Sequence, residues 1–162
     1  MRFPRVKAQG RSFYHCISRF VHGLFIFGTS GGRCAEAEEF LSLMRRWAAF
    51  TGIRIRKYVL MANHFHILCE VPEPKPLTQS EVLERIEAGY GPERARMLRE
   101  QLARFAQQPD GLEQSKRLLD PYRQQMKNDL SFFMKQLKGC FAQQYNRRHK
   151  QIGRASCRER VC

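Results

Sequence analysis

The 162-residue sequence predicts an α+β fold, and three kinds of pattern support this class. Short runs in the first half combine β-branched and aromatic residues with period-two alternation, which is typical of strands. Two longer segments instead place apolar residues at helical spacing. Between them lies a helical stretch that is poor in aromatic residues and interrupted by glycine and proline.

The N-terminal half predicts the order strand, helix, strand, strand. The first strand covers residues 12–19, and a glycine-containing loop leads to a helix at 35–50 that Gly52 ends. That helix carries one apolar stripe, made of Phe40, Leu43, Met44, Trp47 and Phe50. Residues 53–61 begin with strict alternation and form the second strand. A turn at Ala62-Asn63 leads to a more buried strand at 65–71, which ends at Pro72 because proline cannot continue a ladder.

The C-terminal half is predicted to be helical. Residues 77–129 form a helical insertion, in which Thr78 and Glu81 provide the two ends of a capping box. This insertion either determines substrate specificity or is plain solvated packing. From Leu130 a longer helix follows, and its apolar stripe comprises Phe133, Leu137, Cys140, Phe141 and Tyr145.

The composition narrows the class of protein. A net charge of +14 favours a polyanionic partner such as nucleic acid, although a solvated basic surface is the alternative. No apolar run is long enough to cross a membrane, and the N-terminus does not resemble a secretory signal, so we expect a cytoplasmic protein without a membrane partner. The six cysteines lack metal-binding spacing and are expected to be free thiols in a reducing compartment.

The sharpest chemical feature is the tripeptide His64-Phe65-His66. In a strand, His64 and His66 project to one face while Phe65 points into the core. Two neighbouring imidazoles supply half of a divalent-metal site, and a metal there could assist the cleavage of a phosphodiester. The alternative is a pair of hydrogen-bonded surface histidines. We expect His15, in the first strand, to be structural and not a ligand.

At these residues the sequence resembles the single-tyrosine HUH transposases, which include the IS two-hundred type and the REP-associated tyrosine transposases. HUH denotes histidine, hydrophobic residue, histidine, as at 64–66. The resemblance covers about residues 10–73 strongly and 130–151 moderately. It rests on Tyr14-His15-Cys16-Ile17-Ser18-Arg19, Phe25-Ile26-Phe27, Phe40-Leu41-x-Leu43, residues 58–68 and the helix from Met134 to Arg148.

The resemblance implies a ferredoxin-like fold, with an antiparallel sheet and helices on one face. It also implies that His64 and His66 hold Mg²⁺ or Mn²⁺ against the scissile phosphate of single-stranded or hairpin DNA. A tyrosine attacks this phosphate, and the resulting 5′-phosphotyrosine allows the strand to be rejoined without ATP. Such a protein would act as a homodimer and would associate with the bacterial nucleoid.

The nucleophile is the part of this pattern that the sequence does not supply. The family carries a Gly-x-Leu-Trp segment and then a Tyr-Ile-x-x-Asn-Pro-like segment with the catalytic tyrosine, and both are missing here. Tyr145 is the fallback candidate, and its alternative role is to close the apolar stripe of its helix.

The last residues offer a reason for the missing segments. Residues 152–162 resemble a translated sequencing adapter, so we expect the domain to span 1–151, to be truncated before its tyrosine, and to carry a non-native tail at 152–162. A short disordered basic terminus is the alternative.

For DNA contact we favour basic residues that would neutralise phosphates and not read bases, although a solvated surface is the alternative for each. They are Arg19, Arg54, Arg56, Lys135, Lys138, Arg147 and Arg148. Besides a transposase, two functions stay open. One is a non-catalytic module that binds single-stranded nucleic acid. The other is a metal-dependent hydrolase that uses His64 and His66 with water as the nucleophile.

Overall fold

A computed structural model of the chain describes residues 10–20, 25–28, 34–150 and 157–161. It confirms the α+β class. The elements are β1 (Ser12–Phe20), α1 (Ala35–Thr51), β2 (Arg54–Met61), β3 (His64–Val71), α2 (Gln79–Tyr90), α3 (Pro92–Phe105), α4 (Gly111–Gln125), α5 (Leu130–Arg148) and β4 (Cys157–Val161).

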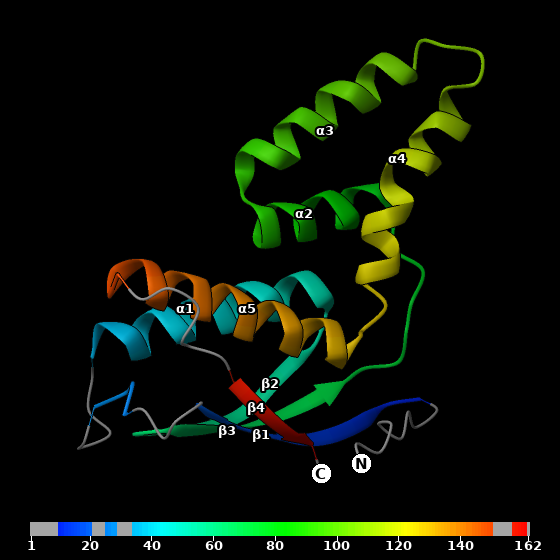
Figure 1. Ribbon diagram of the computed structural model, residues 1–162. Coiled ribbons are helices and arrows are strands. Elements are labelled where there is room, and N and C mark those ends of the chain that lie inside the picture. Colours follow the sequence, from blue (N-terminus) through cyan, green and yellow to red (C-terminus); the bar gives the residue numbers. More distant parts are fainter. Residues whose placement is uncertain (1–9, 21–24, 29–33, 151–156, 162) are drawn as a thin grey trace.

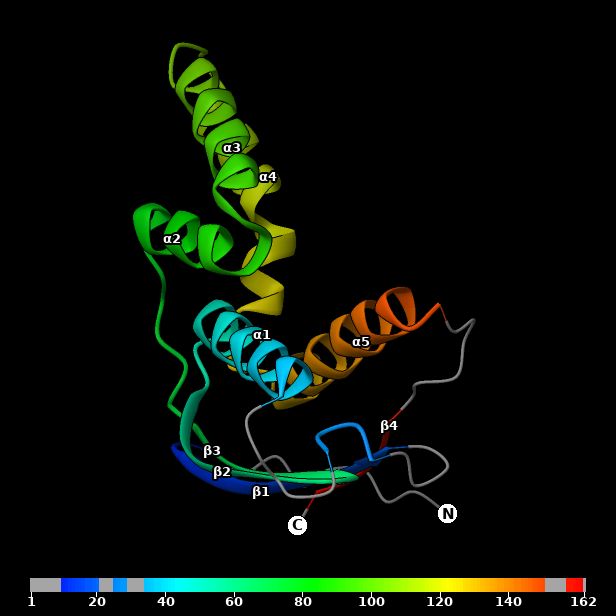
Figure 2. The same cartoon turned by 90° about the vertical axis from the view of Figure 1, so that its left-hand side faces the viewer.

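The strands form one antiparallel sheet in the order β2-β3-β1-β4. Because β3 runs antiparallel to both β1 and β2, these two strands are parallel to each other. The chain thus follows the ferredoxin-like order of strand, helix, strand, strand, helix, strand, with α2, α3 and α4 inserted between β3 and α5. Helices α1 and α5 cover one face of the sheet, and no helix of the described chain covers the other face (Figures 1 and 2). We call this second face the open face.

The strand β4 falls within the segment 152–162. Its backbone pairs with β1, from Cys16 opposite Val161 to Phe20 opposite Cys157. Residues 152–156 and 162 lie outside the described residues. The non-native origin of this segment stays a prediction.

The core lies between the sheet and the two helices that cover it. Phe40 of α1 packs against Phe65 of β3 with ring centroids 4.6 Å apart, and against Phe141 of α5 at 5.2 Å. Phe133 and Leu137 of α5 are also buried, so both predicted helical stripes are confirmed. Helix α1 ends as expected at Gly52, whose φ of 80° is a left-handed conformation that glycine adopts without strain.

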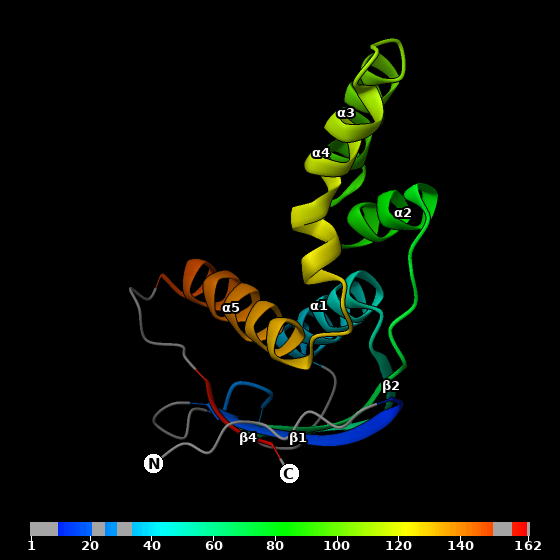
Figure 3. The same ribbon diagram turned by 90° about the vertical axis from the view of Figure 1, so that its right-hand side faces the viewer.

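The insertion packs on α1, on the side away from the sheet (Figure 3). Helix α2 begins with the predicted capping box between Thr78 and Glu81. Its residues Val82 and Ile86 are buried. Gly89 allows close contact with α1, because a Cβ atom at this position would lie 2.5 Å from the Phe50 ring. Helices α3 and α4 extend outward from α2 (Figure 3).

Two expectations from composition can be checked on the described residues. Cys16, Cys34, Cys69 and Cys140 are free thiols, as predicted. None of the described helices has the length and apolar character needed to cross a membrane.

Candidate functional site

The turn between β2 and β3 fixes the position of the predicted histidine pair. The backbone N–H of Phe20 donates to the carbonyl oxygen of Asn63 at 3.0 Å, and that of Phe27 donates to the carbonyl oxygen of Ala62 at 3.1 Å. These bonds tie the turn to the end of β1 and to the segment that follows it. His64, the first residue of β3, therefore starts from an anchored backbone.

The two histidines project to the open face, as the sequence predicted. Phe65 between them is fully buried in the core, whereas His64 and His66 are partly exposed. Their ring centroids are 5.2 Å apart. Alternation along β3 thus places two imidazoles side by side on the face that no described helix covers.

A third histidine, His15, joins the pair, although the sequence predicts only a structural role for it. His15 of β1 lies diagonally from His66, because Ile17 is the direct partner of His66 in the β1–β3 register. Nε2 of His15 lies 2.9 Å from Nδ1 of His66, and the two rings stack with centroids 5.0 Å apart. Only the strand register could have revealed this contact, and periodicity does not specify register.

Hydrogen bonds determine which ring nitrogens are available to a ligand. Nδ1 of His64 lies 2.8 Å from the amide oxygen of Asn63, which can only accept, so in the neutral ring Nδ1 carries the proton and Nε2 has the lone pair. In the tautomer where Nδ1 of His66 donates to His15, Nε2 of His66 is likewise free. Burial, followed by the charges of His15 and His64, lowers the pKa of His66, which keeps the ring neutral at pH 7.

These features fit a partial ligand set for a divalent metal. Metal-bound histidines usually donate their second ring N–H to an oxygen or another acceptor, as Nδ1 of His64 does to Asn63. Mg²⁺ and Mn²⁺ take mainly oxygen ligands, so oxygen atoms would have to complete the coordination around the two imidazoles. Within the described chain, no group of three His, Cys, Asp or Glu side chains is arranged to hold a metal ion. The site therefore offers two imidazole nitrogens and leaves the remaining positions to other ligands.

The structure divides the predicted DNA-binding residues between the two faces of the sheet. Arg19 is exposed and lies directly opposite His64 in the register. Arg54 and Arg56 contact Glu70, which lies further along the face of His64 and His66. The others belong to α5, which covers the opposite face, and they are Lys135, Lys138, Arg147 and Arg148. Of these, Arg148 pairs with Glu36 and Glu39 of α1.

Tyr145 also lies on the helix side of the sheet. Its ring packs against Phe141 and His149, with centroids 6.2 and 4.3 Å away. Burial, followed by the charge of Glu36, raises the pKa of the Tyr145 hydroxyl, which disfavours the phenolate. Since Phe141 itself packs on Phe20 of the sheet, the strands separate Tyr145 from the histidines. The placement supports its alternative role as the residue that closes the apolar stripe.

No protein-family model matches this chain, and neither does any curated protein.

Proposed function

We propose that the chain is the metal- and DNA-binding part of a single-tyrosine HUH transposase, an enzyme that cleaves and rejoins single-stranded DNA through a phosphotyrosine. The observation that carries this proposal is the pair of His64 and His66 on the open face, with ring nitrogens free for a metal and Arg19 opposite. The resemblance of residues 58–68 to that family supports the same reading.

Each residue has a defined task in the proposed reaction. His64 and His66 would hold a divalent metal, which when bound supplies charge neutralisation to a phosphoryl oxygen. Asn63 and His15 orient the two imidazoles. Arg19 would neutralise a phosphate next to the metal.

The nucleophile is not found on this face. The chain has five tyrosines, all within the described residues. Tyr14 and Tyr58 pair with Cys69 and Ile67, two residues of the core-facing side of β3, and the other three lie on helices. We therefore expect this chain to bind DNA, more tightly with a divalent metal, without forming a covalent adduct.

Binding of a single-stranded DNA hairpin with and without Mn²⁺ tests this proposal. Mn²⁺ should tighten binding by the wild-type chain and should have no effect on His64→Ala. The matched control is His149→Ala, which removes an exposed histidine from the end of α5 and should behave as the wild type.

The other outcomes identify the rival functions. Tight DNA binding that Mn²⁺ does not change in any variant would favour a non-catalytic nucleic-acid module. Cleaved product without a protein–DNA adduct would favour the hydrolase with water as nucleophile. An adduct that Tyr145→Phe abolishes would show that Tyr145 is the nucleophile after all.

A further inference from the structure

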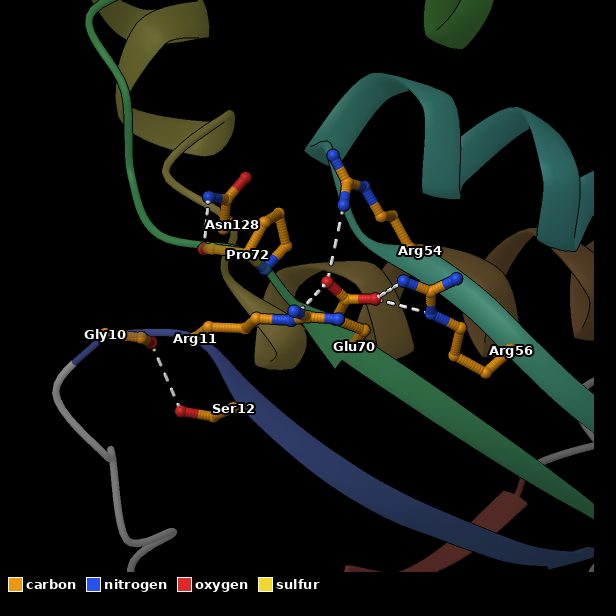
Figure 4. Close-up of polar contacts among 8 residues, drawn as sticks. All are labelled: Gly10, Arg11, Ser12, Arg54, Arg56, Glu70, Pro72 and Asn128. Carbon is orange, nitrogen blue, oxygen red and sulfur yellow. Dashed lines mark hydrogen bonds and ion pairs between the residues drawn. The ribbon is translucent and has the colours of Figure 1, made fainter.

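A buried carboxylate on the open face is surrounded by three arginines (Figure 4). Glu70 of β3 shares the face of His66, four residues along the same strand. Arg11 lies 2.8 Å from its Oε1 atom and Arg54 lies 3.3 Å from the same atom, while Arg56 donates to Oε2. One guanidinium group comes from the residue before β1 and two come from β2, so two chain segments converge on one acid of β3.

The charges of this cluster do not balance. The Glu70 side chain is 0% exposed, whereas those of Arg11, Arg54 and Arg56 are 60%, 63% and 44% exposed. Burial alone would raise the pKa of Glu70, but the hydrogen bond from Arg56 and the charges of the three arginines outweigh it and lower the pKa. The acid stays ionised, and the cluster keeps an excess of two positive charges on its exposed side.

The carboxylate also orders the arginines. Each guanidinium has five N–H donors, and one carboxylate can accept only about four hydrogen bonds in total. Most donors therefore remain available to another anion. Because Glu70 already holds the three side chains in place, a phosphate that binds them would lose less conformational entropy than on free arginines.

An exposed aromatic residue lies beside the arginines. Phe13 is the direct partner of Glu70 in the β1–β3 register and is 54% exposed. The guanidinium carbon of Arg11 lies 5.2 Å from the centre of its ring. Cationic groups that contact the backbone, together with an aromatic ring on which a base can stack, are typical of surfaces that bind single strands. A paired base in a duplex would not be free to stack in this way.

We infer that Arg11, Arg54 and Arg56, ordered by Glu70, bind backbone phosphates of single-stranded DNA, while Phe13 stacks on a base. This subsite lies about 13 Å from His66, which is the length of four residues along β3. The identification of DNA as the ligand of this subsite rests on the proposed function. The strand would then run along the open face, from the histidines and Arg19 at one end to the arginine cluster at the other.

Salt-dependent binding separates the two kinds of contact. Anisotropy of a labelled oligothymidylate of about 16 nucleotides, without metal, measures the affinity at several salt concentrations. Arg54→Ala should weaken binding about tenfold and should lower the slope of log affinity against log salt by about 0.7, since one phosphate contact is lost. Phe13→Ala should weaken binding about tenfold with an unchanged slope. The control is Arg96→Ala on α3, whose guanidinium pairs with Glu93 and Glu100, and it should bind as the wild type.

A pair of charge-matched variants tests the role of Glu70. Glu70→Gln and Glu73→Gln each remove one negative charge, and Glu73 is an exposed residue without an ion pair in the described part of the chain. If Glu70 orders the arginines, Glu70→Gln should bind more weakly than Glu73→Gln, once circular dichroism shows that both are folded. Equal affinities of the two variants would overturn the ordering role.

The subsite and the proposed function can fail separately. If Arg54→Ala and Phe13→Ala bind like the wild type while Mn²⁺ still acts through His64, the subsite is wrong and the function stands. If the variants lose affinity as expected but Mn²⁺ never affects binding, the subsite stands and the metal-dependent function is wrong.

Discussion

The contact between His15 and His66 leads to a specific prediction about metal affinity. His15→Ala removes the ring whose Nε2 lies 2.9 Å from Nδ1 of His66. Without this partner, the His66 ring loses the bond that directs its Nε2 towards a metal. Removal of such an outer partner typically lowers metal affinity 10- to 100-fold, or by about 1.4 to 2.7 kcal/mol. We therefore expect the affinity of His15→Ala for Mn²⁺ to be about 10- to 100-fold lower than that of the wild type.

Isothermal titration with Mn²⁺, or the electron paramagnetic resonance signal of free Mn²⁺, measures this affinity directly and does not depend on catalysis. His66→Ala should lose measurable binding because a ligand is missing. His15→Gln should recover part of the affinity, because its amide oxygen can accept the bond from Nδ1 of His66. His149→Ala again serves as the control.

Two results would refute the positioning role. If His15→Ala matches the wild type while His66→Ala loses binding, the contact does not influence the metal. If His15→Ala loses as much affinity as His66→Ala and His15→Gln restores nothing, His15 is itself a ligand.

Three further predictions concern stability, each measured by urea unfolding. Phe65→Ala should lower the free energy of unfolding by about 3–5 kcal/mol because the ring is buried, whereas the exposed Phe13→Ala should change it by about 0.5 kcal/mol at most. Gly52→Ala should cost at least about 1–2 kcal/mol, since its φ is 80° and the new Cβ would lie 2.5 Å from Nη1 of Arg85. Burial lowers the pKa of His66, so this side chain takes up a proton less readily in the folded protein than in the unfolded chain. The contribution of His66 to the free energy of unfolding is therefore fully present above about pH 6.5. It is lost as the pH falls through the pKa of the folded state. His66→Gln should flatten this acid-side loss, and a wild type equally stable at pH 5 and 7 would contradict the assignment.

The sequence predicts many of the helices and strands because their patterns involve residues that are close together in the chain. Period-two alternation identified β2, the turn at Ala62-Asn63 and the stop at Pro72 delimited β3, and the stripe that ends at Gly52 identified α1. Other features depend on contacts that periodicity does not describe. The side chain of Cys34 caps α1 by accepting from the Ala37 N–H, although cysteine is not a usual capping residue. The register between β2 and β3 also shifts between Ile55 and Lys57, which no alternation pattern reveals.

The same distinction applies to the candidate site. The shared face of His64 and His66 could be predicted because side chains two residues apart in one strand point to the same face. His15 and Glu70 could not, since their roles depend on neighbours from other segments. The basic residues of α5 were predicted to contact DNA together with Arg19, yet they lie on the other side of the sheet. A sequence does not state on which side of a sheet a helix packs.

The position of the insertion limits what it can do for a strand on the open face. Helix α2 buries its apolar side against α1, so the sheet and α1 separate most of the insertion from the histidines. The exception is the end of the sheet, where a cavity of about 410 Å³ lies beside Arg54 of the arginine cluster. Its lining includes the basic residues Arg85, Arg123 and Lys127 and the acidic residues Glu73 and Glu81. A DNA strand that passed Arg54 would meet these basic groups next. Helix α2 thus packs on α1, and any influence of the insertion on substrate choice would have to act at this end of the sheet, beyond the arginine cluster.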